Sequence, residues 1–293
     1  SWEKSRTGEK LLPGFKPNDV ARIVITADGS KTRLKKKEGI WRVADRYDYP
    51  ADFDTLRSLV KKIADLKISR AYPATEPHFR ELQVMVPGAL EDDDKAASGT
   101  ALTFYDKEGD VTRTVVIGKR YNAPGRRYQS GRYVRVLENG TVALTRQTFR
   151  NLETDPAEWL DPAFVDVGKI HNVSSMADGQ TQWTIGREAE SADLNLEGPI
   201  PEGKKVDTEA LQDLEDTVSQ LAFRDVADPE ITPKESGLDS PKRYIIKDFK
   251  GVKTVLKVGE KGKSNTIHVS VDVAYSGMPS ESASQNTEKE AEG

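Results

Sequence analysis

The segment between Lys119 and Arg135 has the residue types most typical of a binding site. It contains arginine and tyrosine side chains in close succession and no acidic residue. Guanidinium groups form paired hydrogen bonds with carboxylate or phosphate, and tyrosine rings offer flat faces to a sugar. The run Asn122-Ala123-Pro124-Gly125 predicts a loop at its middle, and binding residues often lie on loops. The candidate ligand-binding residues are Arg120, Arg126, Arg127 and Tyr128.

The same segment also fits a solvated β-hairpin without a ligand. The run Arg132-Tyr133-Val134-Arg135 alternates like a strand, and the outward side chains of a surface strand are polar in any case. Two interpretations therefore stay open, an anion or glycan contact and a solvated hairpin. Ligand binding that is unchanged after Arg126→Ala and Arg127→Ala would exclude the first.

The rest of the sequence carries no signature of a known catalytic or metal site. It has no G-x-S-x-G elbow, no H-E-x-x-H motif and no G-x-G-x-x-G motif after a predicted strand. The three histidines, His78, His171 and His268, fall in different predicted elements. Cysteine is absent, which excludes disulfides, thiolate nucleophiles and sulfur-ligated metals. We expect no catalytic residues, no metal ligands and no cofactor, and therefore a protein that is not an enzyme.

Two short motifs are excluded by their context. Gly262-Lys263-Ser264 resembles the end of a phosphate-binding loop, but Lys257 stands where that motif requires glycine. The tripeptide also joins two predicted strands instead of opening a helix. The acidic run Glu91-Asp92-Asp93-Asp94 lacks the ligand spacing and the glycine of a calcium loop. We interpret the first motif as a hairpin tip and the second as a solvated loop.

Length and composition narrow the class of protein. The 293 residues favour two domains at typical sizes of about 100 to 200 residues. Charged residues make up 31% of the sequence and the net charge is −4, so no global field selects nucleic acid as a partner. No apolar run approaches the ~18 residues that a membrane-spanning helix needs. The start at Ser1-Trp2, without an initiator methionine, predicts that a targeting or anchoring segment has been removed.

One backbone plan recurs in the two halves of the sequence. Two predicted helices have the same spacing between their apolar residues, and each follows an aspartate at the N-cap position. The apolar residues are Leu56, Leu59, Ile63 and Leu66 after Asp52, and Leu211, Leu214, Val218 and Leu221 after Asp207. Three further anchors pair Asp19–Ile23 with Asp166–Ile170, Trp41–Val43 with Trp183–Ile185, and a hairpin turning at Gly109 with one turning at Gly251. Four anchors in one order predict an internal duplication, and the alternative is two unrelated α+β domains.

We therefore predict an α+β fold with two tandem duplicated domains, each an antiparallel β-sheet with one main helix packed on a face. The predicted boundaries are an N-terminal extension at 1–18, a first α+β repeat at 19–147, a helical linker at 148–165, a second α+β repeat at 166–275 and a disordered tail at 276–293.

Several short motifs of the sequence match those of a known family. They are Gly39-Ile40-Trp41-Arg42-Val43, Tyr49-Pro50-Ala51-Asp52, Val116-Ile117-Gly118-Lys119, Arg132-Tyr133-Val134-Arg135, Trp159-Leu160-Asp161 and Gly237-Leu238-Asp239-Ser240-Pro241. With these motifs the sequence resembles a bacterial family of envelope proteins, the domain of unknown function 4340 family. The resemblance covers nearly the whole chain, from about Leu11 to Tyr275. Its motifs are structural, and no catalytic residues come with it.

The resemblance implies a protein exported across the inner membrane and encoded beside ABC transporter subunits of the gliding-motility type. It implies an extracytoplasmic location on the periplasmic side, with membrane contact only through an N-terminal anchor that this sequence lacks. We expect a non-enzymatic accessory or scaffold module that binds a protein partner, with transporter subunits as candidates, through the cleft between the repeats or exposed sheet edges. The alternatives are a receptor for an anionic saccharide or peptide, and a hydrolase with dispersed carboxylates.

Overall fold

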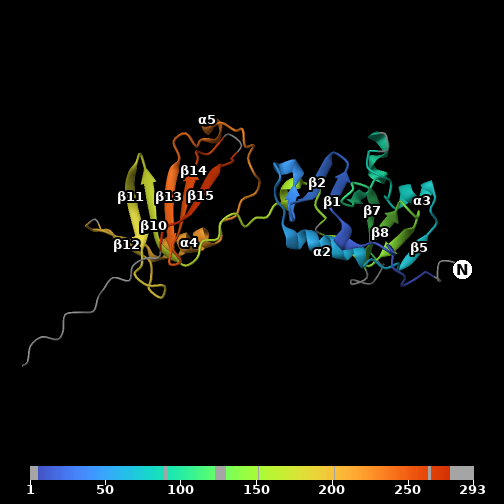
Figure 1. Ribbon diagram of the computed structural model, residues 1–293, viewed down its shortest axis with the longest axis horizontal. Coiled ribbons are helices and arrows are strands. Elements are labelled where there is room, and N and C mark those ends of the chain that lie inside the picture. Colours follow the sequence, from blue (N-terminus) through green and yellow to red (C-terminus); the bar gives the residue numbers. More distant parts are fainter. Residues whose placement is uncertain are drawn as a thin grey trace, which may run out of the picture. The chain divides into compact units, whose positions relative to one another are not determined.

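The computed structural model describes residues 6–88, 92–122, 130–150, 152–200, 202–262 and 265–277. The chain forms two compact units (Figure 1). The first unit comprises Ser1–Pro162 together with Arg224–Val226, and the second comprises Ala163–Phe223 and Ala227–Gly293. A short segment late in the chain therefore belongs to the first unit, although the residues on both sides of it belong to the second.

The first unit is built on a nine-stranded antiparallel sheet in the order β4-β3-β2-β1-β6-β7-β8-β9-β5. Its strands are β1 (Arg22–Ala27), β2 (Ser30–Lys37), β3 (Ile40–Val43), β4 (Tyr49–Pro50), β5 (Arg70–Tyr72), β6 (Thr100–Tyr105), β7 (Val111–Asn122), β8 (Ser130–Val136) and β9 (Val142–Thr145). Alternation along the strands places Ile23, Ile25 and Leu34 in the core, where each is fully buried.

Helix α2 (Phe53–Ala64) is the main helix of the first unit (Figure 1). It buries Leu56, Leu59, Val60 and Ile63, which is the stripe expected from their spacing. The helix begins after Asp52, whose side chain accepts a hydrogen bond from the Thr55 amide. The shorter helices are η1 (Pro17–Asp19), η2 (Ala44–Arg46), α3 (Glu76–Glu81), η3 (Asp92–Ala97) and η4 (Pro156–Trp159).

The second unit contains a six-stranded antiparallel sheet in the order β12-β11-β10-β13-β14-β15. Its elements are β10 (Ile170–Ala177), β11 (Gln180–Gly186), β12 (Asn195–Glu197), α4 (Thr208–Ser219), α5 (Pro233–Ser236), β13 (Lys242–Asp248), β14 (Val252–Val258) and β15 (Val269–Tyr275). Leu211 and Val218 of α4 pack into one core with Val173, Ile246 and Leu256 of the sheet. The prediction of an α+β fold with antiparallel sheets and one main helix on each is confirmed.

The two sheets share a strand order. Six strands of the first sheet, β3-β2-β1-β6-β7-β8, follow the same sequence of neighbours as β12-β11-β10-β13-β14-β15 of the second. The main helix also falls at the same point of the chain order, after β3 and β4 in the first unit and after β12 in the second. A shared order is what an internal duplication predicts, and common ancestry of the units remains a prediction.

The paired hairpins agree in detail, but one of the other anchors is wrong. The Asp106 side chain accepts from the Gly109 amide at 3.0 Å, and the Asp248 side chain accepts from the Val252 amide at 2.8 Å, so an aspartate closes each turn. Trp41, however, lies in β3, whereas Trp183 lies in β11, which has the place of β2. Alternating strands that contain tryptophan look alike in sequence wherever they fall in a meander, so the pattern could not separate these positions.

Candidate functional site

The cationic segment predicted as a binding site lies on β7 and β8, next to each other in the first sheet. Arg120 is near the end of β7, and Arg126, Arg127 and Tyr128 lie outside the described residues. The β7–β8 pairing shifts between Ile117 and Arg120, where β7 gains one residue over its partner strand. This bulge places Arg120 directly opposite Arg132.

A second group of cations lies on the opposite face, above an aromatic cluster. The Tyr133 ring contacts Tyr72 and Tyr121 edge-on, with centroid distances of 5.4 and 6.1 Å. Lys119 Nζ lies 5.9 Å from the centre of the Tyr133 ring, and the Arg135 guanidinium lies 3.6 Å from the centre of the Phe79 ring.

This aromatic face is a small core of its own. Tyr133 and the strand residues Val116 and Val142 are buried against Leu82 and Val84, which follow α3. Burial and a hydrogen bond with Tyr72 raise the pKa of Tyr133 well above that of a free tyrosine. Lys119 and Arg135 therefore serve packing on this face, and the predicted cationic site divides between two sides of the sheet.

A shallow groove runs along α2 on the first unit. It has a volume of about 300 Å³ and is lined by Asp54, Thr55, Ser58, Leu59, Lys62, Phe149, Leu152 and Trp159. Trp159 forms its buried floor, and the indole N–H donates to the Glu153 carbonyl at 3.1 Å. The sequence did not predict this groove. The residues of its two walls are far apart in the chain, and the residue pattern of each wall is that of an ordinary helix or loop.

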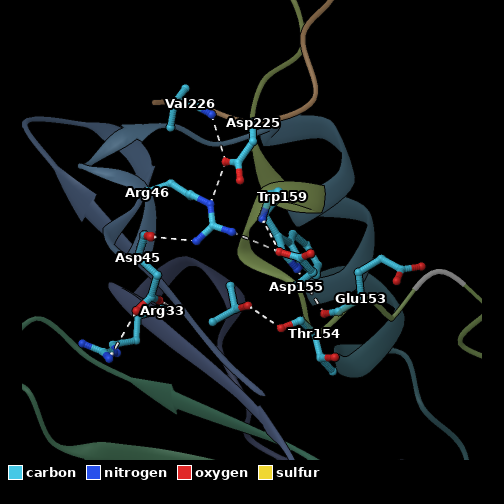
Figure 2. A network of polar contacts seen from close by, with 11 residues as sticks. Arg33, Asp45, Arg46, Glu153, Thr154, Asp155, Trp159, Asp225 and Val226 are labelled. Atoms are coloured by element: carbon cyan, nitrogen blue, oxygen red, sulfur yellow. Dashed lines mark hydrogen bonds and ion pairs between the residues drawn. The ribbon is translucent and has the colours of Figure 1, made fainter. Parts of the chain in front are cut away.

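Arg46 lies at the centre of a network of hydrogen bonds and ion pairs in the first unit (Figure 2). Its Nε donates to Asp225 Oδ1 at 2.6 Å and its Nη2 to Asp155 Oδ1 at 3.4 Å. Asp225 Oδ1 also accepts from the Val226 amide, and Asp155 Oδ1 accepts from the Ala157 amide as an N-cap. The two carboxylates satisfy the guanidinium, so this network holds Arg224–Val226 in place and offers no free cation to a ligand.

Strand β15 forms an edge of the second sheet. Val269, Val273 and Tyr275 have exposed fractions of 46%, 57% and 71%. They lie on the same face of the strand as Val271, which pairs with Leu256 and packs on the core. The apolar face of the sheet is therefore exposed to solvent at this edge strand. Asp272 is the single charged residue of β15, and Lys257 pairs with it at 2.7 Å.

The described residues contain no group of three histidine, aspartate or glutamate side chains placed to hold a metal ion. Within the same ranges, no helix is long and apolar enough to cross a lipid bilayer.

The fold defines a two-unit α+β protein whose antiparallel sheets carry an opposed arginine pair in one unit and an exposed apolar edge strand in the other. The chain belongs to the family described as domain of unknown function (DUF4340), which matches residues 41–241. This match reaches into both units and confirms the resemblance drawn from the motifs. No curated protein and no solved structure shows a significant match to the chain.

Proposed function

We propose that this chain is a non-enzymatic, extracytoplasmic accessory or scaffold module that binds a protein partner, with subunits of an ABC-type transporter as the candidate partner. The observation that supports a binding role is the edge strand β15. The extracytoplasmic location and the type of partner come from the family resemblance.

Strand β15 combines the two features that a strand-binding partner uses. An edge strand presents unpaired backbone N–H and C=O groups, to which an extended segment of another chain can pair. The seven residues of β15 span about 23 Å at about 3.3 Å per residue. A strand added at this edge would also cover Val273 and Tyr275, and burial of their apolar surface would add to the backbone hydrogen bonds.

The direct test measures binding of transporter subunits to a chain with a charged β15. The tagged protein is co-expressed with ABC transporter subunits of the gliding-motility type, the partner that the family resemblance implies, and purified in mild detergent. The bound subunits are quantified by mass spectrometry. We expect Val273→Lys to reduce the bound subunits about tenfold or more, because a strand partner would have to bury the new ammonium group.

Val111→Lys is the matched control. Val111 is exposed to 52% on a strand of the first unit, so the same substitution adds the same charge to a different strand. Circular dichroism establishes that both variants fold. Equal retention of the subunits by both variants would contradict the assignment of β15, and no retention by the unmodified chain would contradict the transporter partner.

The location has its own test. In cells whose outer membrane has been made permeable, an added protease should cleave the native protein while a cytoplasmic marker stays intact. Protection of the protein until the inner membrane is lysed would contradict an extracytoplasmic module.

A further inference from the structure

Arg120 and Arg132 form a pair of like charges on neighbouring strands. They are direct cross-strand partners, and Asn122 and Ser130 are the next such pair along the same strands. Side chains in direct register have their Cβ atoms about 4.5 to 5.5 Å apart, and like charges in this arrangement destabilise a sheet. Arg120 is exposed and Arg132 is half-buried, so an opposite charge bound between them would relieve a repulsion that solvent screens only in part.

The described protein supplies no such charge. Among the described residues neither guanidinium has an ion-pair partner, and the Arg132 Nε is buried without a hydrogen-bond acceptor. Burial, and after it the positive charge of Arg120, lower the pKa of Arg132. Strands β7, β8 and β9 contain no aspartate or glutamate along their whole length.

Several other arginines of the chain have a carboxylate within ion-pair distance. Arg33 pairs with Asp45 at 3.2 Å, Arg46 with Asp225 at 2.6 Å, and Arg187 with Glu215 at 2.5 Å. Arg42 and Arg135, like Arg132, have a buried Nε without an acceptor. What distinguishes Arg120 and Arg132 is that two guanidinium groups without a carboxylate partner lie in direct cross-strand register.

The bulge in β7 selects the side chain that faces Arg132. Without the extra residue, the register that pairs Ile117 with Val134 would place Lys119 opposite Arg132. With it, Arg120 takes that position and Lys119 turns to the aromatic face, above Tyr133. Bulges commonly re-aim a side chain near a functional site. The bulge therefore places the guanidinium groups of Arg120 and Arg132 on the same face in direct register. The N–H donors of each group match the geometry of an oxyanion.

We propose that Arg120 and Arg132 form a binding site for a doubly charged oxyanion with the chemistry of a phosphate group. Two guanidinium groups balance the charge of about −2 on a phosphate monoester, whereas a single carboxylate would balance only one of them. The neutral side chains of Asn122 and Ser130 follow on the same face of the two strands, where each can donate a further hydrogen bond. The site is made by residues of the first unit, and the proposal uses no residue of β15.

Calorimetric titration of the full chain with inorganic phosphate, at about pH 8 and constant ionic strength, tests the site. We expect saturable binding that weakens about tenfold or more in Arg120→Gln and in Arg132→Gln, because each removes charge-assisted hydrogen bonds. Arg57→Gln is the matched control, since Arg57 lies exposed on α2 and its replacement changes the net charge equally. The control should bind phosphate like the unmodified chain.

Further arms identify the source of the phosphate group. Glucose 1-phosphate and vesicles of phosphatidylcholine with phosphatidic acid carry it on a sugar and on a lipid, and glucuronate carries a single carboxylate. Binding of either phosphate carrier that depends on Arg132 supports the site and names its source. Glucuronate binding as tight as that of glucose 1-phosphate would overturn the doubly charged ligand.

Thermal unfolding separates a binding role from a structural one. In phosphate-free buffer of low ionic strength, we expect Arg120→Gln to unfold at the same temperature as the unmodified chain or higher, because it relieves the repulsion. Phosphate should then raise the unfolding temperature of the unmodified chain and of Arg57→Gln more than that of Arg120→Gln. Equal stabilisation of all three would indicate a general salt effect and overturn the site, as would the absence of phosphate binding in the titration.

Discussion

At the scale of single residues, Arg187 has the most deeply buried charge among the described ion pairs. Its side chain is 3% exposed, and its Nη2 donates to Glu215 Oε1 at 2.5 Å. The Nε donates to the Ile170 carbonyl at 2.7 Å and Nη1 to the Ala192 carbonyl at 3.2 Å. Lys169 Nζ donates to the same Glu215 oxygen at 2.8 Å. One arginine thus joins β10, α4 and a loop of the second unit.

Glu215→Gln should destabilise the second unit by about 2 to 3 kcal/mol, because it leaves the buried Arg187 charge without a counter-charge. Asp213→Asn is the matched control, since Asp213 is exposed on the same helix and should change the free energy of unfolding by less than about 0.5 kcal/mol. Urea unfolding followed by circular dichroism measures both. Equal effects of the two variants would show that Arg187 does not depend on Glu215.

The same carboxylate should make the stability depend on pH. Burial alone would raise the pKa of Glu215, but the hydrogen bonds and charges of Arg187 and Lys169 outweigh it, and the pKa is lowered. Since the folded pKa lies below the unfolded value of about 4.3, the contribution is complete above that value and is lost as pH falls through the folded pKa.

The difference in free energy of unfolding between the unmodified chain and Glu215→Gln should therefore be larger at about pH 7 than at about pH 3. Urea unfolding of both proteins at the two pH values measures it. A difference that stays constant between them would mean that Glu215 carries no stabilising charge.

At the scale of elements, the two main helices begin in the same way. Asp52 accepts from the Thr55 amide at 3.0 Å, and Asp207 accepts from the amides of Glu209 and Ala210 at 3.1 Å each. We expect Asp52→Ala and Asp207→Ala each to cost about 1 kcal/mol in urea unfolding, because first-turn amides lose their acceptor. Asparagine keeps that acceptor, so Asp52→Asn and Asp207→Asn should cost much less. Equal losses for alanine and asparagine would exclude a capping role.

The elements also show how far the sequence could predict the structure. The stripe of α2, the aspartate caps and the hairpin turns are local patterns, so spacing alone indicated them. The opposition of Arg120 and Arg132 depends on a one-residue bulge in a pairing that no local pattern specifies. The Arg46–Asp225 pair joins positions 179 residues apart, which periodicity cannot detect. The sequence therefore predicted a cationic segment, whereas the division of its described cations between two faces of the sheet required the structure.

At the scale of the whole molecule, each unit buries its own core. Ile23 in the first unit is completely buried, and Ile246 in the second is 1% exposed within a cluster of side chains from α4 and the second sheet. Trp183 packs against that same cluster and can report on the second unit by fluorescence. Since the shared strand order gives each unit a complete sheet and helix, each should unfold as a cooperative structure of its own.

We therefore expect two transitions in scanning calorimetry, with Ile23→Ala lowering one and Ile246→Ala lowering the other. Each substitution removes a buried side chain and should cost about 2 to 5 kcal/mol in its own unit. The part of the tryptophan fluorescence that is lost on Trp183→Phe should follow the transition that Ile246→Ala lowers and should be unaffected by Ile23→Ala. A single transition shifted by both variants would mean that the units unfold together, and that neither unit is stable without the rest of the chain.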